Sequence, residues 1–309
     1  MGWFESNEVL IQTWITLTIL SFSVYVALRS GVFSMAGIGF SAVGGYIAGR
    51  LAIDGWSTVP AILIAVVVSV VGGLALGLIL GRLRSLYLAM ATFAFVLLVR
   101  FAALHWESQT GGALGLLGIP ARVTTFGALG VAAVLALLLA FYERGRSGRM
   151  LEALRLDEVV AAHVGVNVVR QRMFAFVIGS AIGAIAGALN SLMFSFVLPD
   201  SVSFSVIVDT LTVVVIGGLG AWWGAALGAA VVVLLPDVFG FTNEWRLVVQ
   251  GVAVVLIVMY APGGLVGLIR SAITRCVKRE RKEPVVGAMA GGSDSSVSAL
   301  WTTDTEGLQ

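Results

Sequence analysis

Residues 59–80, VPAILIAVVVSVVGGLALGLIL, form a run of 22 residues without one charged side chain. An α-helix needs about 20 mostly apolar residues to cross the hydrocarbon core of a bilayer. The run therefore predicts a membrane-spanning helix, and the rest of the chain has the same character. Of its 309 residues, 59% are hydrophobic and only 12% are charged, whereas soluble domains carry about 25% charged residues. The composition excludes a soluble domain and indicates a protein that crosses the membrane several times.

Similar runs recur along the whole chain. We expect spans near residues 9–28, 32–53, 59–80, 85–104, 126–142, 173–196, 204–220, 221–238 and 245–268. The first of them lacks the basic flank of a cleaved signal peptide, so we expect it to remain as a helix. The predicted fold class is all-α: a polytopic transmembrane helical bundle of about 8–10 helices, with glycine-interrupted segments.

Two glycine-rich segments predict the interruptions. The first holds Gly37, Gly39, Gly44 and Gly45, and the second holds Gly217, Gly218 and Gly220. Paired interruptions in opposite halves of a transporter are typical of a substrate path near the middle of the bilayer. Small residues also let helices pack closely. The sequence leaves both interpretations open.

The basic residues indicate which way the chain faces. Most lie in loops on one predicted side or near the C-terminus: Arg29, Arg82, Arg84, Arg144, Arg146, Arg149, Arg155, Arg170, Arg172, Arg270, Arg275, Lys278, Arg279, Arg281 and Lys282. Arg50, Arg122 and Arg246 fall on the other side. Cytoplasmic loops are enriched in Lys and Arg, so the C-terminus is predicted to be cytoplasmic.

We accordingly expect two regions. Residues 1–270 form a transmembrane domain that includes a cytoplasmic loop, 143–172. Residues 271–309 form a basic juxtamembrane stretch followed by a small, polar cytoplasmic tail whose composition is typical of disorder.

The cytoplasmic loop contains the most polar stretch between the apolar runs. Leu151 and Leu154 give a first helix one apolar edge, and Asp157 is placed to cap the N-terminus of a second helix. Gly165 supplies a turn after it. Loops of compact proteins are usually shorter and carry no capped helix of their own. The loop is thus either a docking segment for another protein or an ordinary connection.

Chemical motifs are scarce. The chain has no G-x-x-x-x-G-K-[ST] loop for ATP phosphates, and its single cysteine, Cys276, forms no metal-binding cluster. We predict no catalytic residue and no metal site. Charges inside the predicted spans are few, chiefly Arg100 and Asp209, which disfavours a proton- or sodium-driven carrier. A further segment, Thr110, Gly111 and Gly112, lies in an outer loop and is interpreted as a gate, a docking site or a flexible hairpin.

Six stretches carry a family resemblance. They are SGVFSMAGIGFSAVGGYIA (30–48), RLRSLYLAMATFAF (82–95), TGGALGLLGIP (110–120), GRMLEALRLDEVVAAHVGVN (148–167), LPDSVSFSVIVDTLTVVVIGGLGAWWGAALGA (198–229) and APGGLVG (261–267). Together they resemble, in the right order, segments of the LivM-type permeases of branched-chain amino acid ABC transporters. The resemblance covers about residues 10–270.

The resemblance implies a non-enzymatic transport subunit of a bacterial inner membrane. It implies a homologous LivH-type permease, two ABC ATPase subunits that hold ATP and Mg²⁺, a periplasmic or lipid-anchored binding protein, membrane lipid and no nucleic acid as partners. The chain itself would bind no cofactor. Loop 146–172 would include the coupling helix, with contacts to the ATPase from Arg155, Asp157, Glu158, Ala161, Ala162 and Gly165. The spacing from Glu158 to Gly165 departs from the strict importer motif.

Three alternatives remain from the sequence. A relative of the same family could import urea, short amides or another small polar solute. A passive channel or a secondary carrier would need no ATPase, and a membrane enzyme would need a catalytic set that the chain lacks.

Overall fold

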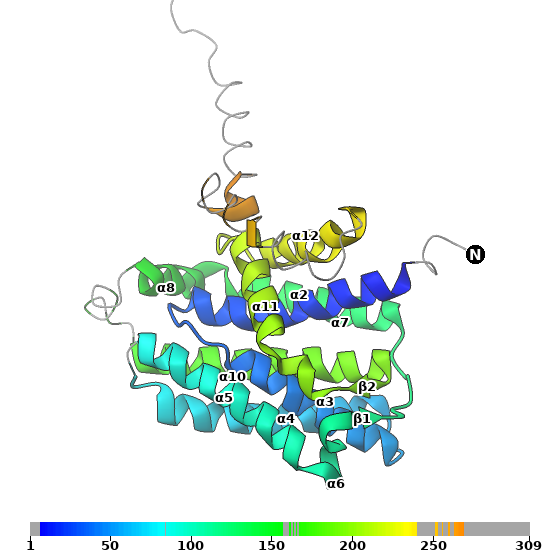
Figure 1. The fold of residues 1–309 in the computed structure, drawn as a ribbon. Coiled ribbons are helices and arrows are strands. Elements are labelled where there is room, and N and C mark those ends of the chain that lie inside the picture. Colours follow the sequence, from blue (N-terminus) through cyan, green and yellow to red (C-terminus); the bar gives the residue numbers. More distant parts are fainter. Residues whose placement is uncertain are drawn as a thin grey trace, which may run out of the picture. The chain divides into compact units, whose positions relative to one another are not determined.

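The computed structural model describes residues 7–83, 85–156, 161, 163, 165, 167–239, 251, 252, 255, 259 and 263–268. Within these ranges the chain is almost entirely helical (Figure 1), and the strands there are two residues long. The all-α prediction is confirmed. Residues Met1–Ile269 form one compact unit. The predicted tail, 271–309, lies outside the described residues.

Six described helices are long and apolar enough to cross a membrane. They are α2 (Glu8–Arg29), α3 (Ala36–Ile53), α4 (Thr58–Leu80), α5 (Ser85–His105), α7 (Thr125–Tyr142) and α10 (Val168–Phe194). Each coincides with a predicted span. Helix α10 begins five residues before the predicted start at 173, because the Asn167 side chain accepts a hydrogen bond from the Arg170 amide and caps the helix there.

The next two predicted spans are shorter helices, α11 (Phe204–Gly217) and α12 (Trp223–Phe239). At 1.5 Å per residue, the 14 residues of α11 reach about 21 Å, short of a hydrocarbon core of about 30 Å. The helices part at Gly218, which has a φ of 88°. Glycine adopts this left-handed conformation without steric cost, so the predicted interruption of this segment is confirmed. Most of the last predicted span, 245–268, lies outside the described residues.

The predicted interruption of 32–53 is wrong, because α3 is continuous from Ala36 to Ile53. Its glycines serve helix packing instead. A Cβ added to Gly44 would lie 2.5 Å from both the Cα and the carbonyl oxygen of Ala184 in α10. A Cβ on Gly37 would overlap the Ser23 side chain of α2. Close backbone approach, which only small residues permit, therefore holds α3 in the centre of the bundle.

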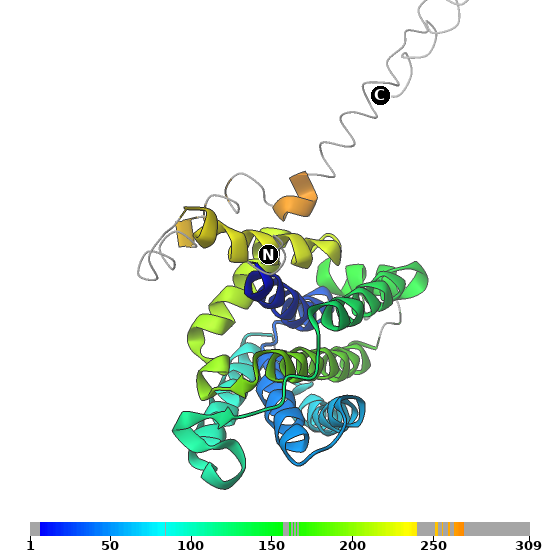
Figure 2. The same ribbon diagram turned by 90° about the vertical axis from the view of Figure 1, so that its right-hand side faces the viewer.

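Helix α10 is the hub of the arrangement. It lies between α2 on one side and α3 and α4 on the other (Figure 2). Helix α2 also packs against α7, α11 and α12, and the Trp14 indole of α2 donates a hydrogen bond of 3.0 Å to the Ala226 carbonyl of α12. These contacts join α2 to the two short helices α11 and α12.

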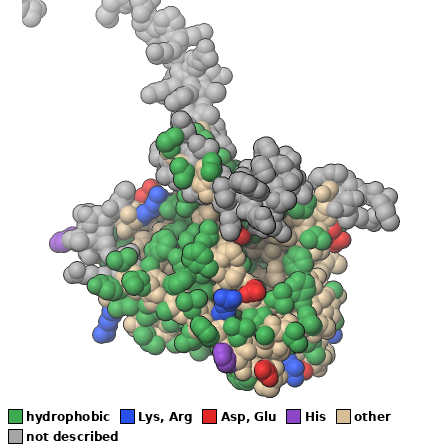
Figure 3. Space-filling model, in the orientation of Figure 1, with side chains coloured by type: hydrophobic (Ala, Val, Ile, Leu, Met, Phe, Trp, Pro, Cys, Tyr) green, Lys and Arg blue, Asp and Glu red, His purple; other side chains and the backbone are tan. Residues whose placement is uncertain are grey.

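Helices α4, α5 and α7 supply much of the outer surface. Large apolar side chains on them are exposed, for example Val67 (60%), Leu98 (64%) and Leu137 (58%). Hydrophobic side chains cover most of the face seen in Figure 3, and charged groups are sparse there. Such a surface is stable against lipid rather than water.

Short elements close the two ends of the bundle (Figure 1). One end, here the β end, carries α6 (Glu107–Thr110), the 3-10 helices η1 (Gly112–Leu114) and η2 (Pro199–Val202), and the antiparallel strands β1 (Leu116–Leu117) and β2 (Phe196–Val197). The opposite end, here the α8 end, carries α8 (Gly145–Leu156).

Candidate translocation cleft and coupling end

A cleft of about 240 Å³ lies among α2, α3, α10, β2, η2, α11 and α12. Its polar lining is Thr13, Thr16, Ser41, Asn190, Ser201 and Asp209. Its apolar lining includes Leu17, Leu20, Val197, Val206 and Val233. The α2 residues come from the half of that helix nearer the β end, so the cleft lies in that half of the bundle.

Several of the polar groups offer acceptor oxygens to the cleft. The hydroxyls of Thr13, Thr16 and Ser41 donate to the carbonyls of Val9, Gln12 and Ile38 in their own helices, at 2.8, 3.0 and 2.7 Å. A hydroxyl whose proton is engaged in such a hydrogen bond can still accept a hydrogen bond from a ligand through its lone pairs.

Two further groups add to this polarity. The Asp209 carboxylate is a strong acceptor. The Ser201 hydroxyl is buried and has no hydrogen-bond partner among the described residues, which is costly unless a ligand or water satisfies it. The lining of the cleft therefore combines acceptor oxygens with aliphatic side chains. This arrangement suits a small molecule that has an ammonium group and an apolar side chain.

An ion pair holds η2 against α5. Arg100 of α5 contacts the Asp200 carboxylate at 2.7 Å, with the two side chains 37% and 75% exposed. Ser201 of the cleft follows Asp200 directly, so the ion pair also fixes one wall of the cleft. The sequence shows Arg100 as a charge within a span, but no local pattern links it to a residue 100 positions away.

A second junction lies at the α8 end. Arg29, the last residue of α2, is buried, with 8% of its surface exposed. Its guanidinium contacts Glu152 of α8 at 3.6 Å and donates to the Leu219 carbonyl, in the turn between α11 and α12, at 3.3 Å. One side chain thus joins α8 to the interruption of the late helix pair. One turn earlier, the Tyr25 hydroxyl donates to Glu143, which follows α7.

Comparison with known proteins identifies the family. The model of the family described as "Branched-chain amino acid transport system / permease component" matches residues 8–259. The chain belongs to this permease family.

Individual relatives agree with that assignment. The permease protein LivM of a high-affinity branched-chain amino acid transport system in Salmonella typhimurium is 29% identical over 290 residues, covering 81% of this chain and 67% of the relative. The Escherichia coli LivM gives the same values. The Escherichia coli permease LivH is 29% identical over 137 residues, 44% of each chain. No solved structure matches the chain.

The predicted coupling residues of this permease lie at the α8 end where they are described. Leu151 and Leu154 are buried, as the predicted apolar edge of α8 requires, and Arg155 is exposed. Ala161 is buried, and Gly165 is exposed with a φ of 88°. Asp157, Glu158 and Ala162 lie outside the described residues, so the cap and the docking contacts stay predictions.

The predicted path glycines do not form one site. Gly45 lines the cleft. Gly37 and Gly44 pack against neighbouring helices, and Gly39 packs against Phe95 of α5. Gly217, Gly218 and Gly220 lie at the interruption near Arg29, where Gly218 approaches Gly263 and Gly264 closely. The cleft hydroxyls could not be predicted from the sequence, because Ser and Thr in apolar helices look alike whether or not they face a cavity.

The predicted outer-loop residues form an ordered turn of the permease at the β end. The buried Thr110 hydroxyl donates to the carbonyls of Ala103 at 2.6 Å and Trp106 at 2.8 Å. Gly111 and Gly112 follow with φ values of 75° and 62°. These bonds tie the end of α5 to the turn. Its role as a gate or dock is untested.

Proposed function

We propose that the chain is the transmembrane permease subunit of an ATP-driven ABC importer for branched-chain, that is hydrophobic, amino acids. The observation that carries the proposal is the family match over residues 8–259, together with LivM relatives described as high-affinity branched-chain amino acid permeases. The chain is the transport part, and partner subunits bind ATP and Mg²⁺ and hydrolyse the nucleotide.

The chemistry of the cleft supports this substrate class. An amino acid with a branched aliphatic side chain would place its ammonium group near Asp209 and the lone pairs of Ser41 and Thr16. Its side chain would contact the leucine and valine lining. Urea and short amides have no such side chain and would leave the aliphatic lining without a partner, which favours the amino acid over these alternatives.

The α8 end supports a route for coupling. In the proposed assembly the ATPase subunits act on this chain through its loop 146–172. A movement of α8 would reach the α11–α12 turn through Arg29, which contacts Glu152 and the Leu219 carbonyl. A LivH-type permease would complete the membrane pair. The binding protein would deliver substrate at the β end, next to Thr110, Gly111 and Gly112, with the α8 end and the C-terminus in the cytoplasm.

The test is transport by the assembled complex in proteoliposomes. Radiolabelled leucine should accumulate only with ATP on the side of the ATPases and with the binding protein on the other. Asp209→Asn should raise the leucine concentration needed for half-maximal uptake, because it removes the charge that meets the ammonium group. Gly130→Ala, on an open part of α7, is the matched control and should transport normally.

Each alternative function has its own outcome. Transport of urea in preference to leucine would move the proposal to small polar solutes. Solute flux through the chain alone, without ATP, would replace it with a channel or carrier.

A further inference from the structure

A second and larger cavity lies away from the proposed path. It is a groove of about 560 Å³ on the outer side of α3, between α4 and α5 near the β end. Helices α4 and α5 both pack on α3 but hardly touch each other. The face of α3 between them is therefore left open along Val43, Ile47 and Arg50, which recur at helical spacing.

The walls of the groove away from its polar rim are mainly aliphatic, with Tyr46 among them, and its mouth faces outward. Val68 of α4 is 45% exposed and Leu98 of α5 is 64% exposed. Both helices are predominantly exposed and apolar, as spans in contact with lipid are. The groove volume lies within the range of about 300–1,000 Å³ that small-molecule sites fill. An apolar channel with such walls would hold a hydrocarbon chain rather than a polar solute.

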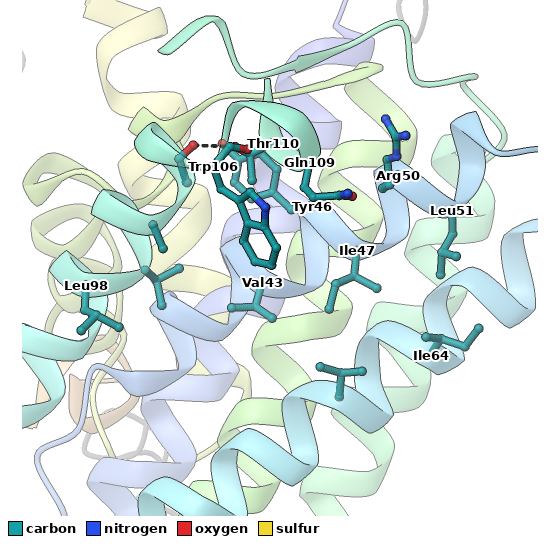
Figure 4. A pocket seen from close by; sticks show the side chains of 14 residues that line it. Val43, Tyr46, Ile47, Arg50, Leu51, Ile64, Leu98, Trp106, Gln109 and Thr110 are labelled. Atoms are coloured by element: carbon teal, nitrogen blue, oxygen red, sulfur yellow. Dashed lines mark hydrogen bonds between the residues drawn. The ribbon is translucent and has the colours of Figure 1, made fainter. Parts of the chain in front are cut away.

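Polar groups gather at one rim of the groove. Figure 4 shows Arg50, Gln109 and Thr110 along that rim, with Val43, Ile47 and Leu98 farther along the groove. Trp106 beside them is 61% exposed, and tryptophan is enriched at the headgroup level of bilayers. The stripe from Val43 to Arg50 is about 10 Å long at 1.5 Å per residue, less than the depth of one leaflet, which is half of about 30 Å.

Among the described residues, Arg50 is the one charged side chain that lines the groove. Its Nε lies 3.7 Å from the Asp54 carboxylate. Its two terminal nitrogens make no hydrogen bond to the described residues and remain on a side chain that is 42% exposed. A guanidinium offers a fork of donors that matches a phosphate group.

From the groove and its rim we infer a binding site for one phospholipid. One acyl chain lies along α3 between α4 and α5, and the headgroup phosphate contacts Arg50. The transfer of an acyl chain from bilayer to groove gains little hydrophobic free energy, because both surroundings are apolar. Retention of the lipid therefore depends on the phosphate contact and on the fit to the groove. The site is separate from the cleft and does not depend on the proposed substrate.

The experiment uses the full transporter in membranes that contain a phosphatidylglycerol with a photoactivatable group in its acyl chain. After illumination, labelled peptides are mapped by mass spectrometry. Labelling should concentrate at Ile47, Val68 and Leu98, several-fold above other exposed residues of α4 and α5. Val68→Trp should fill the groove and lower this labelling several-fold. Val71→Trp, on an exposed part of the same helix outside the groove, should leave it unchanged.

Arg50→Gln tests the phosphate contact and should reduce the amount of phospholipid that stays bound through detergent extraction. Uniform labelling of all exposed faces, or equal effects of Val68→Trp and Val71→Trp, would identify ordinary surrounding lipid and overturn the proposal. Crosslinking of the groove to the second permease in place of lipid would overturn it as well.

Discussion

Replacement of Gly44 by alanine tests the packing that places both walls of the cleft. Gly44 faces α10 at a point of close backbone approach, and the added Cβ would lie 2.5 Å from the Cα and the carbonyl oxygen of Ala184. A real Cβ keeps at least 3.0 Å from such atoms. Helices α3 and α10 must therefore separate by about 0.5 Å or more, and no rotation of a side chain can relieve the contact, because both atoms belong to the backbone.

The expected cost is that of overpacking, about 1–3 kcal/mol. Gly130→Ala is the matched control, because no atom of the described part of the chain lies within 4 Å of a Cβ added to Gly130 of α7. Both changes gain the same helix propensity, about 0.5–1 kcal/mol, so the difference between them isolates the contact. At about 2–4 °C per kcal/mol, the unfolding midpoint of Gly44→Ala should lie roughly 2–12 °C below that of Gly130→Ala.

The assay is thermal unfolding of the purified complex in mild detergent, followed by the loss of monodisperse protein. Leucine uptake should fall as well, because Gly45, the neighbour of Gly44, and Gly187 of α10 both line the cleft. Equal midpoints for Gly44→Ala and Gly130→Ala would refute the close approach of α3 and α10 and, with it, the position of the cleft.

Three further predictions follow from single contacts. Arg172 donates hydrogen bonds to the carbonyls of Gly81 at 3.2 Å and Leu83 at 2.9 Å, just beyond the end of α4. Because Arg172→Met removes both bonds, it should lower the free energy of unfolding by about 1.5–3 kcal/mol, measured as a loss of thermal stability. Asp200→Asn should change stability by less than about 1 kcal/mol, as for other exposed pairs, yet raise the KM of leucine uptake by loosening η2. The charge exchange Arg100→Asp with Asp200→Arg should recover part of that change, and no recovery would argue against the pair. Glu152→Gln should leave expression and stability unchanged but lower the leucine transported per ATP, and an unaltered ratio would remove the Arg29 junction from the coupling route.

The long helices could be predicted from the sequence, because each requires only an apolar run of sufficient length, although a cap such as Asn167 can extend a helix beyond its run. The interruption at Gly218 was also predictable, since three glycines within four residues leave little side-chain packing to hold a helix together. The same reasoning failed for Gly37 to Gly45. There the glycines lie against Ser23, Phe95 and Ala184, and such long-range packing keeps the helix intact. Glycine content does not distinguish a broken helix from a closely packed one.

The site was less predictable than the fold. Thr16, Ser41 and Ser201 come together from three parts of the chain, and nothing near each residue indicates that it lines a cleft. From the sequence, Arg29 is only one of several basic residues in the predicted loops. Its junction with Glu152 and the Leu219 carbonyl depends on how α2, α8 and α11 end side by side, which no local pattern encodes.

The most direct test of the central proposal is whether a P-loop ATPase copurifies with the tagged chain from mild detergent. Wild type is compared with the double variant Glu158→Arg and Gly165→Leu, and with Gly130→Ala as the control. We predict that wild type and Gly130→Ala retain the ATPase and that the double variant, expressed at the same level, loses it. An ATPase absent from every sample of intact chain would contradict the account that separate subunits drive this permease through residues 146–172.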